Sequence, residues 1–355
     1  MPIQHKKRIL IAPLNWGLGH ATRCIPIIKA LINHNFEPII ASDGIALSLL
    51  KIEFPDLTCL DLPSYNITYP KKGKHFKLKM LQSSPKMAKA IKAEKKAVAS
   101  IIADYQIDGI ISDNRLGVHN KDLPCVFITH QLQVLSGNTT WLSTKLHQKI
   151  IKQFNECWVP DNLGDINLSG KLGHTTIYDI PIKFIGPLSR FSKKERPIKF
   201  DVMVLLSGPE PQRTLFEKKL LNEFNNYKGS VIFVKGVIEN EQLISEEKNR
   251  VIYNYMTSSQ LENAINESAL IVSRSGYTTL MDLTKLSKNA FFVPTPGQYE
   301  QEYLAERLTT LGFVASCKQD EFTVEKLNDV SNYKGLSAMD YIVNYNKLFS
   351  LFERK

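Results

Sequence analysis

Residues 269–279 read Ala-Leu-Ile-Val-Ser-Arg-Ser-Gly-Tyr-Thr-Thr, and this stretch determines the fold that we predict for the chain. The run at 269–273 is short, apolar and rich in branched side chains, which is typical of a buried strand. Gly276 then turns the chain into a helix. The same pattern recurs with a strand at 290–294 and a helix that opens after Gly297. Repeated units of this kind predict an α/β fold with a parallel sheet.

The turn at Ser275 and Gly276 is suited to an anion. Helix N-termini gather where the strands of a parallel sheet end, and their free N–H groups stabilise a phosphate or diphosphate. Asp282 follows six residues after Gly276, where its two oxygens could accept from the hydroxyls of a ribose. The alternative is an ordinary polar helix face. That face would consist of Thr278, Thr279, Asp282 and Lys285.

The composition is that of a globular protein. With 355 residues and 43% hydrophobic content, the chain can form two domains with separate cores. No apolar run approaches the ~18 residues of a membrane span, and residues 1–8 contain no signal-peptide core. Five scattered cysteines without CxxC spacing indicate neither disulfides nor a zinc site. We therefore expect a cytoplasmic protein.

Strands and helices alternate in both halves of the chain. The expected strands are 8–13, 37–42, 109–112, 125–129, 156–159, 202–206, 231–235 and 251–255. The expected helices are 22–33, 86–103, 213–224, 258–266 and 337–353. Prolines and charges at 181–196 interrupt this rhythm and indicate a linker. We predict Rossmann-like domains at 1–190 and 201–335, a linker at 191–200, and a helix at 336–355 that packs toward the first domain.

Positive charge is concentrated in one segment. The formal net charge is +10, and ten lysines but only one acid, Glu94, lie between Lys71 and Lys96. Within residues 69–81 the lysines are interleaved with apolar side chains. The alternative is a solvated basic loop. We expect this segment to contact an anionic membrane surface, not nucleic acid, which would give a peripheral position on its inner face.

The loop after the first strand offers a base. It contains Gly17, Gly19 and His20, but Thr22 occupies the third glycine position of a dinucleotide motif, so a dinucleotide site is not indicated. The two glycines leave the backbone uncrowded. A helix start lowers the pKa of a histidine and keeps it a neutral base. The alternative is a capping or surface histidine, and the sequence does not decide between the two.

Two further side chains belong to the same sheet edge. Asp113 follows the strand at 109–112 and could fix the tautomer of His20. A solvated aspartate or helix cap is the alternative. His130 follows the strand at 125–129 and is a rival base.

The second half opens with another candidate anion loop. Ser207, Gly208 and Arg213 stand between a strand and a helix, and Arg190 could add a forked contact to a diphosphate. A linker arginine is the alternative for Arg190. The chain contains no Asp-x-Asp and no His-x-x-x-His motif. We therefore expect no metal and no cofactor, with helix N-termini and arginines meeting the leaving-group charge.

At this point the residues resemble a family. Ser273 to Gly276, then Thr279, Asp282 and Gln301, are similar to the C-terminal signature of the GT-B nucleotide-sugar glycosyltransferases. The similarity is to the family 28-like group of MurG and the galactolipid synthases. It extends to residues 17–20, 186–190 and 207–213, and so covers most of the chain. Pro209 departs from the pattern, since a serine is expected there.

The resemblance implies roles for these positions. Asp282 corresponds to the ribose-binding glutamate, His20 to the proposed base, and Asp113 to the acid of a His–Asp dyad. Donor binding is implied for the remaining signature and loop positions. These are Gly19, Arg190, Ser207, Gly208, Arg213, Ser275, Gly276, Thr278, Thr279, Glu300 and Gln301.

The family further implies an α/β GT-B fold with two Rossmann-like domains facing across a cleft. The first domain would bind an acceptor that carries a hydroxyl group, and a lipid-linked acceptor is a candidate because lipid-linked acceptors are common among the related enzymes. The second domain would bind a UDP-sugar. The activity implied is metal-independent inverting glycosyl transfer. Two alternatives stay open: a GT-B epimerase or hydrolase that uses water, and a non-catalytic nucleotide-sugar-binding protein.

Overall fold

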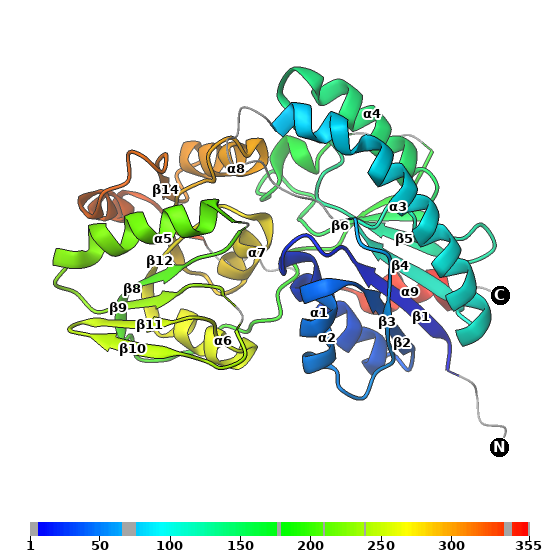
Figure 1. The fold of residues 1–355 in the computed structure, drawn as a ribbon, viewed down its shortest axis with the longest axis horizontal. Helices are drawn as coiled ribbons and strands as arrows, with labels where there is room; N and C mark the ends of the chain where they lie inside the picture. Colours follow the sequence, from blue (N-terminus) through cyan, green and yellow to red (C-terminus); the bar gives the residue numbers. More distant parts are fainter. Residues whose placement is uncertain are drawn as a thin grey trace. The chain divides into compact units, whose positions relative to one another are not determined.

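The computed structural model describes residues 6–65, 76–175, 179–208, 210–237, 239–336 and 343–353, with the backbone alone over 76–86. The chain forms two compact units (Figure 1). Of the described residues, the first unit contains 6–65, 77–188 and 343–353. The second contains residues 189–336. The change of unit at Leu188 falls just before the segment expected as a linker.

The first unit is built on a parallel sheet with strand order β3-β2-β1-β4-β5-β6-β7. Its central strands are apolar and buried on both faces, as parallel strands between helix layers must be. The strands are β1 Arg8–Pro13, β2 Glu37–Ser42, β3 Cys59–Asp61, β4 Gly109–Asp113, β5 Cys125–Ile128, β6 Glu156–Val159 and β7 Ile182–Phe184.

Helices cover both faces of this sheet (Figure 1). On one face Val98 and Ile101 of α3 pack against Leu10 and Phe127. On the other, Phe349 lies 6.3 Å from Trp158 between ring centroids, so the end of the chain packs on the first unit. The helices of the first unit are α1 Gly19–Asn33, α2 Gly44–Glu53, α3 Phe76–Tyr105, α4 Thr140–Ile151 and α9 Tyr345–Glu353.

The second unit repeats the architecture with strand order β10-β11-β9-β8-β12-β13-β14. All neighbours are parallel except the edge pair β10 and β11. The strands are β8 Phe200–Leu205, β9 Val231–Val234, β10 Ile244–Glu247, β11 Arg250–Tyr253, β12 Ser268–Ser273, β13 Asn289–Phe292 and β14 Ala315–Ser316. The helices are α5 Gln212–Glu223, α6 Ser258–Asn266, α7 Tyr277–Lys285 and α8 Tyr299–Thr310. Short 3₁₀ helices are η2 Gly137–Thr139, η3 Gly170–Leu172, η4 Phe224–Asn226 and η5 Val324–Asn332.

The predicted α/β class with two largely parallel sheets is confirmed. Several local expectations were wrong. Residues 182–184 form β7 within the stretch at 181–196 where we expected the strand–helix alternation to break, and α2 and α4 were not foreseen. α9 begins at Tyr345, not near residue 337, and residues 337–342 lie outside the described part. The second sheet also has an antiparallel edge strand, β10, whereas we predicted only parallel strands.

Both sheets have a topological switch point, where the chain leaves neighbouring strands toward opposite faces. β1 lies between β2 and β4, and β8 lies between β9 and β12. Open α/β sheets bind ligands in the crevice outside the strand ends at such points. In the first sheet, the loop that leads to His20 follows β1, and Asp113 is the last residue of β4. In the second sheet, Ser207 follows β8 and Gly276 follows β12. The predicted residues therefore gather at the two switch points.

Candidate active site

The loop between β1 and α1 is held against the end of β4. Pro13 is in register with Asp113, and the Leu14 N–H donates to the Asp113 carbonyl at 2.9 Å. Gly17 adopts φ +75°, a left-handed conformation that favours glycine. The helix then begins at Gly19, one residue before His20. Neighbouring strands thus bring together two side chains that lie 93 residues apart in the sequence.

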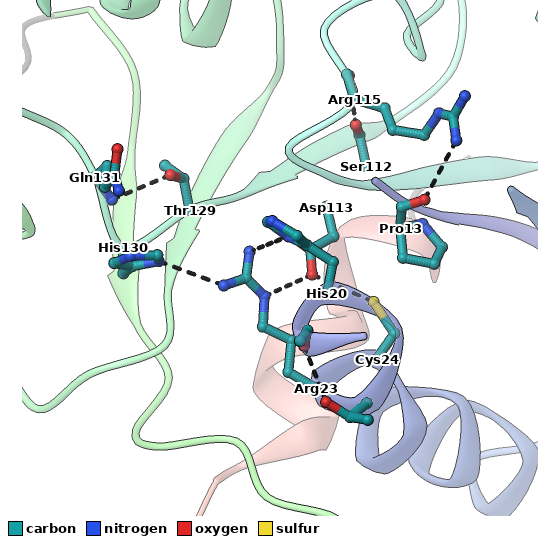
Figure 2. A network of polar contacts seen from close by, with 12 residues as sticks. Pro13, His20, Arg23, Cys24, Ser112, Asp113, Arg115, Thr129, His130 and Gln131 are labelled. Carbon is teal, nitrogen blue, oxygen red and sulfur yellow. Dashed lines mark hydrogen bonds and ion pairs between the residues drawn. The ribbon is translucent and has the colours of Figure 1, made fainter. Parts of the chain in front are cut away.

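His20 and Asp113 are in direct contact (Figure 2). Nδ1 of His20 lies 2.9 Å from Oδ1 of Asp113. The carboxylate is completely buried, whereas the imidazole is 13% exposed. The predicted pair therefore exists, and the carboxylate is more deeply buried than the ring.

Arg23 completes this cluster, and the sequence reasoning missed it. Its Nε donates to Oδ2 of Asp113 at 2.6 Å, and its Nη2 donates to Oδ1. Nη2 also lies 2.9 Å from Nδ1 of His20, and Nη1 lies 3.3 Å from Nδ1 of His130 (Figure 2). The side chain is only 2% exposed. A sequence signal existed, because a cation three residues after His20 on an otherwise apolar helix needs a buried partner.

The electrostatics of the cluster follow from burial and charge. Burial lowers the pKa of His20, and the Arg23 guanidinium lowers it further, while Asp113 acts in the opposite direction. Burial alone would raise the pKa of Asp113, but Arg23 and His20 hold that pKa well below its usual range. At neutral pH His20 is therefore neutral and Asp113 is ionised. Burial and Asp113 raise the pKa of the Cys24 thiol, which donates to Oδ2 at 3.5 Å.

His130 belongs to the same cluster. It follows β5, is 5% exposed, and reaches His20 and Asp113 through Arg23. The loop that carries it turns where the Gln131 N–H donates to Oγ1 of Thr129 at 3.1 Å. The structure thus gathers both candidate bases around one guanidinium.

In the second unit, the N-terminus of α7 differs from those of the other three described helices. α6 has a capping box formed by Thr257 and Gln260, and α8 has Glu300 and Glu302 in its first turn. At α5, the Thr214 N–H donates to Glu210 at 3.3 Å. α7 has neither a side-chain cap nor an acid in its first turn, and Gly276 stands at its N-cap. The positive end of its dipole therefore favours an anion at this position.

Asp282 is half-buried on α7, and Oδ1 accepts a hydrogen bond from the hydroxyl of Ser189 at 2.6 Å. Burial raises the pKa of Asp282 to about 6, although Ser189 and Arg190 partly oppose the shift. Ser189 was missed by the sequence reasoning. Ser189 thus engages one of the two carboxylate oxygens. Thr278 and Thr279 are half-buried in the first turn of the same helix.

Ser275 and Gln301 order the turn before α7. Oγ of the fully buried Ser275 donates to the Gln301 carbonyl at 2.8 Å, and Oε1 of Gln301 accepts from the Thr295 N–H at 2.9 Å. Nη1 of Arg190 donates to Oγ of Ser258 at 2.8 Å. Each of these expected donor-binding side chains thus has a partner within the unit. Their contact with a donor stays a prediction.

The loop after β8 differs from an open phosphate loop. Ser207 and Gly208 are exposed, and Gly208 has φ +103°. Arg213, expected to meet the diphosphate, instead pairs with Glu210 and Glu217, and Nη1 lies 2.7 Å from Oε2 of Glu217. These carboxylates neutralise its charge in this structure. Pro209 lies outside the described residues.

Arg274 is a second cation that the sequence reasoning missed. It is 1% exposed, and no carboxylate partners it among the described residues, so burial lowers its pKa to about 9. Its guanidinium carbon lies 3.9 Å from the ring centroid of Phe216. It donates to oxygens on three loops at the same sheet edge: Val293 O, Pro294 O, Gln212 O and Gln319 Oε1. A buried positive charge therefore stands next to Ser275 in the chain.

Across the part of the chain that the structure describes, no three His, Cys, Asp or Glu side chains are grouped so that they could hold a metal ion. None of the described helices has the length and apolarity needed to cross a bilayer.

Comparisons with known proteins agree with this geometry. Residues 214–333 match the glycosyltransferase family 28 C-terminal domain. Over 231 residues, 63% of the chain, it is 26% identical to the UDP-N-acetylglucosamine–N-acetylmuramyl-(pentapeptide) pyrophosphoryl-undecaprenol N-acetylglucosamine transferase of Buchnera aphidicola. The chain spans 61% of that relative's length. It is 20% identical over 334 residues, 88% of the chain, to an uncharacterised glycosyltransferase of Methanopyrus kandleri, covering 90% of that protein.

Solved structures share the fold at low identity. MurG of Acinetobacter baumannii superposes with a TM-score of 0.57 at 11% identity, covering 98% of this chain and 100% of that one. The glycosyltransferase VinC in complex with DTDP gives 0.59 at 13% identity, with coverage of 98% and 100%. The expected GT-B fold is therefore confirmed.

Proposed function

We propose that the chain, whose residues 214–333 match the glycosyltransferase family 28 C-terminal domain and whose fold is that of GT-B glycosyltransferases, transfers a sugar from a nucleoside diphosphate donor to an acceptor hydroxyl. The donor is a UDP-sugar, the transfer inverts the anomeric carbon, and no metal takes part. The observation that carries the proposal is the uncapped N-terminus of α7 with Asp282 downstream on the same helix.

The donor site follows from three features of the second unit. The N-terminal turn of α7 binds the diphosphate through its dipole and backbone N–H groups, and the buried charge of Arg274 favours the same anion. The second carboxylate oxygen of Asp282 accepts from a ribose hydroxyl. VinC, a structural neighbour, was solved in complex with DTDP, which supports a nucleoside diphosphate as the ligand class. The 26% identity to an enzyme named for UDP-N-acetylglucosamine favours uridine as the base.

The acceptor side follows from His20. Its Nε2 takes the proton of the acceptor hydroxyl, while Nδ1 stays at Asp113. The acceptor oxygen forms a bond to the anomeric carbon as the bond from that carbon to the diphosphate oxygen breaks. The electron pair leaves with the diphosphate, so the configuration inverts. The imidazolium then releases the proton to solvent.

The alternatives predict different products. An epimerase or hydrolase would use water in place of the acceptor, and a binding protein would release no nucleotide. Incubation with a UDP-sugar and water alone separates these cases. We expect slow release of UDP without an acceptor and faster release with one.

We further propose that the acceptor is presented at an anionic membrane surface. The expected basic segment lies largely outside the described residues, since 66–75 are not described and 76–86 only as backbone. A second surface in the first unit supports the idea. Trp141 and Leu146 of α4 are 69% and 56% exposed, and Lys145 and Lys149 are exposed beside them. Apolar anchors beside lysines suit a helix that lies at a lipid headgroup layer.

The experiment that tests the donor class is a thermal-shift panel of nucleosides, nucleoside monophosphates and nucleoside diphosphates. A ligand at 100 times its dissociation constant stabilises the folded state by about 2.7 kcal/mol. We expect UDP to raise the unfolding temperature and uridine to leave it nearly unchanged, because the diphosphate binds α7. A panel in which no diphosphate stabilises the protein would contradict the proposal.

A further inference from the structure

One guanidinium contacts both histidines that compete for the role of base. Nη2 of Arg23 lies 2.9 Å from Nδ1 of His20, and Nη1 lies 3.3 Å from Nδ1 of His130. The same group donates to both oxygens of Asp113 (Figure 2). Arg23 therefore lies where it can determine which ring nitrogen of each histidine carries the proton.

For His130 the assignment follows from donor chemistry. Arginine has five N–H donors and no acceptor. A ring nitrogen that is hydrogen-bonded to arginine must therefore be the unprotonated one. In the neutral ring the proton then resides on Nε2 of His130. In this tautomer Nε2 donates a hydrogen bond and cannot accept a proton.

For His20 the geometry decides between two partners. Nδ1 is 2.9 Å from Oδ1 of Asp113 and 2.9 Å from Nη2 of Arg23, while Nη2 and Oδ1 are closer to each other. Seen from Nη2, the directions to Oδ1 and Nδ1 thus form an acute angle. The two N–H bonds of Nη2 diverge by about 120° because the guanidinium is planar. They cannot point straight at both atoms, and the charged Oδ1 is the stronger acceptor, so the straight bond goes to Oδ1.

The remaining favourable contact is a hydrogen bond from His20 to Asp113. A carboxylate oxygen has lone pairs for two donors, so Oδ1 accepts from both Nη2 and Nδ1. The charge on the carboxylate strengthens both bonds. The proton of the neutral His20 ring is then on Nδ1, and Nε2 is free to take a proton.

We propose that Arg23 is a positioning residue that gives the two histidines opposite roles. His20, held at Nδ1 by Asp113, is the base through Nε2. His130, held at Nδ1 by Arg23, carries its proton on Nε2 and so cannot serve as the base through that nitrogen. The roles in transfer rest on the proposed function, but the tautomers do not.

The test is the tautomeric state of each ring, measured by long-range ¹H–¹⁵N NMR of the full chain labelled with ¹⁵N-histidine. The signals are assigned with His20→Gln and His130→Gln. We expect Nδ1–H for His20 and Nε2–H for His130 at neutral pH without any ligand. Nε2–H at His20, or Nδ1–H at His130, would overturn the proposal.

Arg23→Lys tests whether arginine is the cause. An ammonium group can still neutralise Asp113 but lacks the fork that reaches both rings. We expect the His130 signals to shift toward a mixture of tautomers, with His174 unchanged as an internal control because its Nε2 faces Asp161 at 3.3 Å. An unchanged His130 in the folded variant would show that Arg23 does not set its tautomer. If the variant does not fold, the wild-type spectra still decide between the two assignments.

These spectra separate the inference from the proposed function. They need neither donor nor acceptor. The expected tautomers in a protein that binds no nucleoside diphosphate would count against glycosyl transfer and leave the role of Arg23 intact.

Discussion

Arg23 donates hydrogen bonds to both carboxylate oxygens of Asp113, although the two residues lie 90 positions apart in the chain. Both side chains are almost completely buried. The pair is neutral as a whole, so the cluster with neutral His20 carries no net charge. Proton uptake by His20 would make it a buried cation, which explains why the pKa of His20 is lowered despite the adjacent carboxylate.

Replacing Arg23 with Met is expected to destabilise the protein strongly. The change leaves the Asp113 carboxylate buried without its counter-ion, and breaking a buried pair in this way costs about 3–5 kcal/mol. The measurement is urea-induced unfolding at neutral pH. Lys29→Met on the exposed side of the same helix is the matched control and should cost little. Equal stability of the two variants would show that Arg23 does not support Asp113.

His20→Gln is expected to abolish transfer while UDP still binds. Loss of a general base typically lowers the rate ~10²–10⁴-fold. UDP affinity should stay within about twofold, a change of roughly 0.4 kcal/mol, because no α7 contact is altered. The measurements are UDP release from a UDP-sugar with and without acceptor extract, and UDP calorimetry. A variant with wild-type turnover would move the base role to another group, His130 first.

The donor-site switch point could largely be predicted from the sequence. The apolar run at 269–273 and the following Gly276 already fix a strand, a turn and a helix, and strand order then brings Ser207 and Gly276 to one edge. Local pattern alone therefore located the α7 N-terminus.

Other parts depend on tertiary contacts that no local pattern contains. Ser189 reaches Asp282 across 93 residues, and Arg23 reaches Asp113 across 90. β7 was missed because it has only three residues and lies between prolines, so its sequence pattern resembles that of a linker. Only its pairing with β6 makes it a strand. α4 was missed because Trp141, Leu142 and Leu146 are exposed and its buried apolar residues lie only at its end, so the helix lacks the apolar stripe of a core-packed helix.

Asp282→Asn is expected to stabilise the protein more at pH 7.5 than at pH 4.5. The folded pKa of about 6 lies above the unfolded value of ~3.9, so the folded state binds the proton more tightly. The ionised carboxylate therefore costs stability in full above the folded pKa of about 6, and this cost shrinks as the pH falls from about 6 toward the unfolded value of ~3.9, below which it is gone. Asparagine can still accept from Ser189 and carries no charge. The thermal midpoints of both proteins are compared at the two pH values, and a pH-independent difference would contradict the burial of Asp282.

Wild-type protein is expected to co-sediment with vesicles of equal parts phosphatidylglycerol and phosphatidylcholine at low salt, and less so at high salt. Trp141→Ser with Leu146→Ser should weaken this binding, because both side chains are exposed on α4 beside lysines. Changing Lys71, Lys72, Lys74, Lys77 and Lys79 to Gln should weaken it further. Ile198→Ser, at an exposed apolar position of the second unit, is the control. Binding that none of these changes affects would place the membrane contact elsewhere.

The central claim is that the second unit binds a nucleoside diphosphate at α7, with Asp282 at the ribose. Calorimetric titration of UDP into wild-type protein and into Asp282→Ala tests it most directly. We expect wild-type protein to bind UDP, and the variant to bind at least tenfold more weakly, a loss of about 1.4 kcal/mol or more, while remaining folded. Equal UDP affinity in a folded Asp282→Ala, or no binding of UDP to the wild type, would contradict the claim.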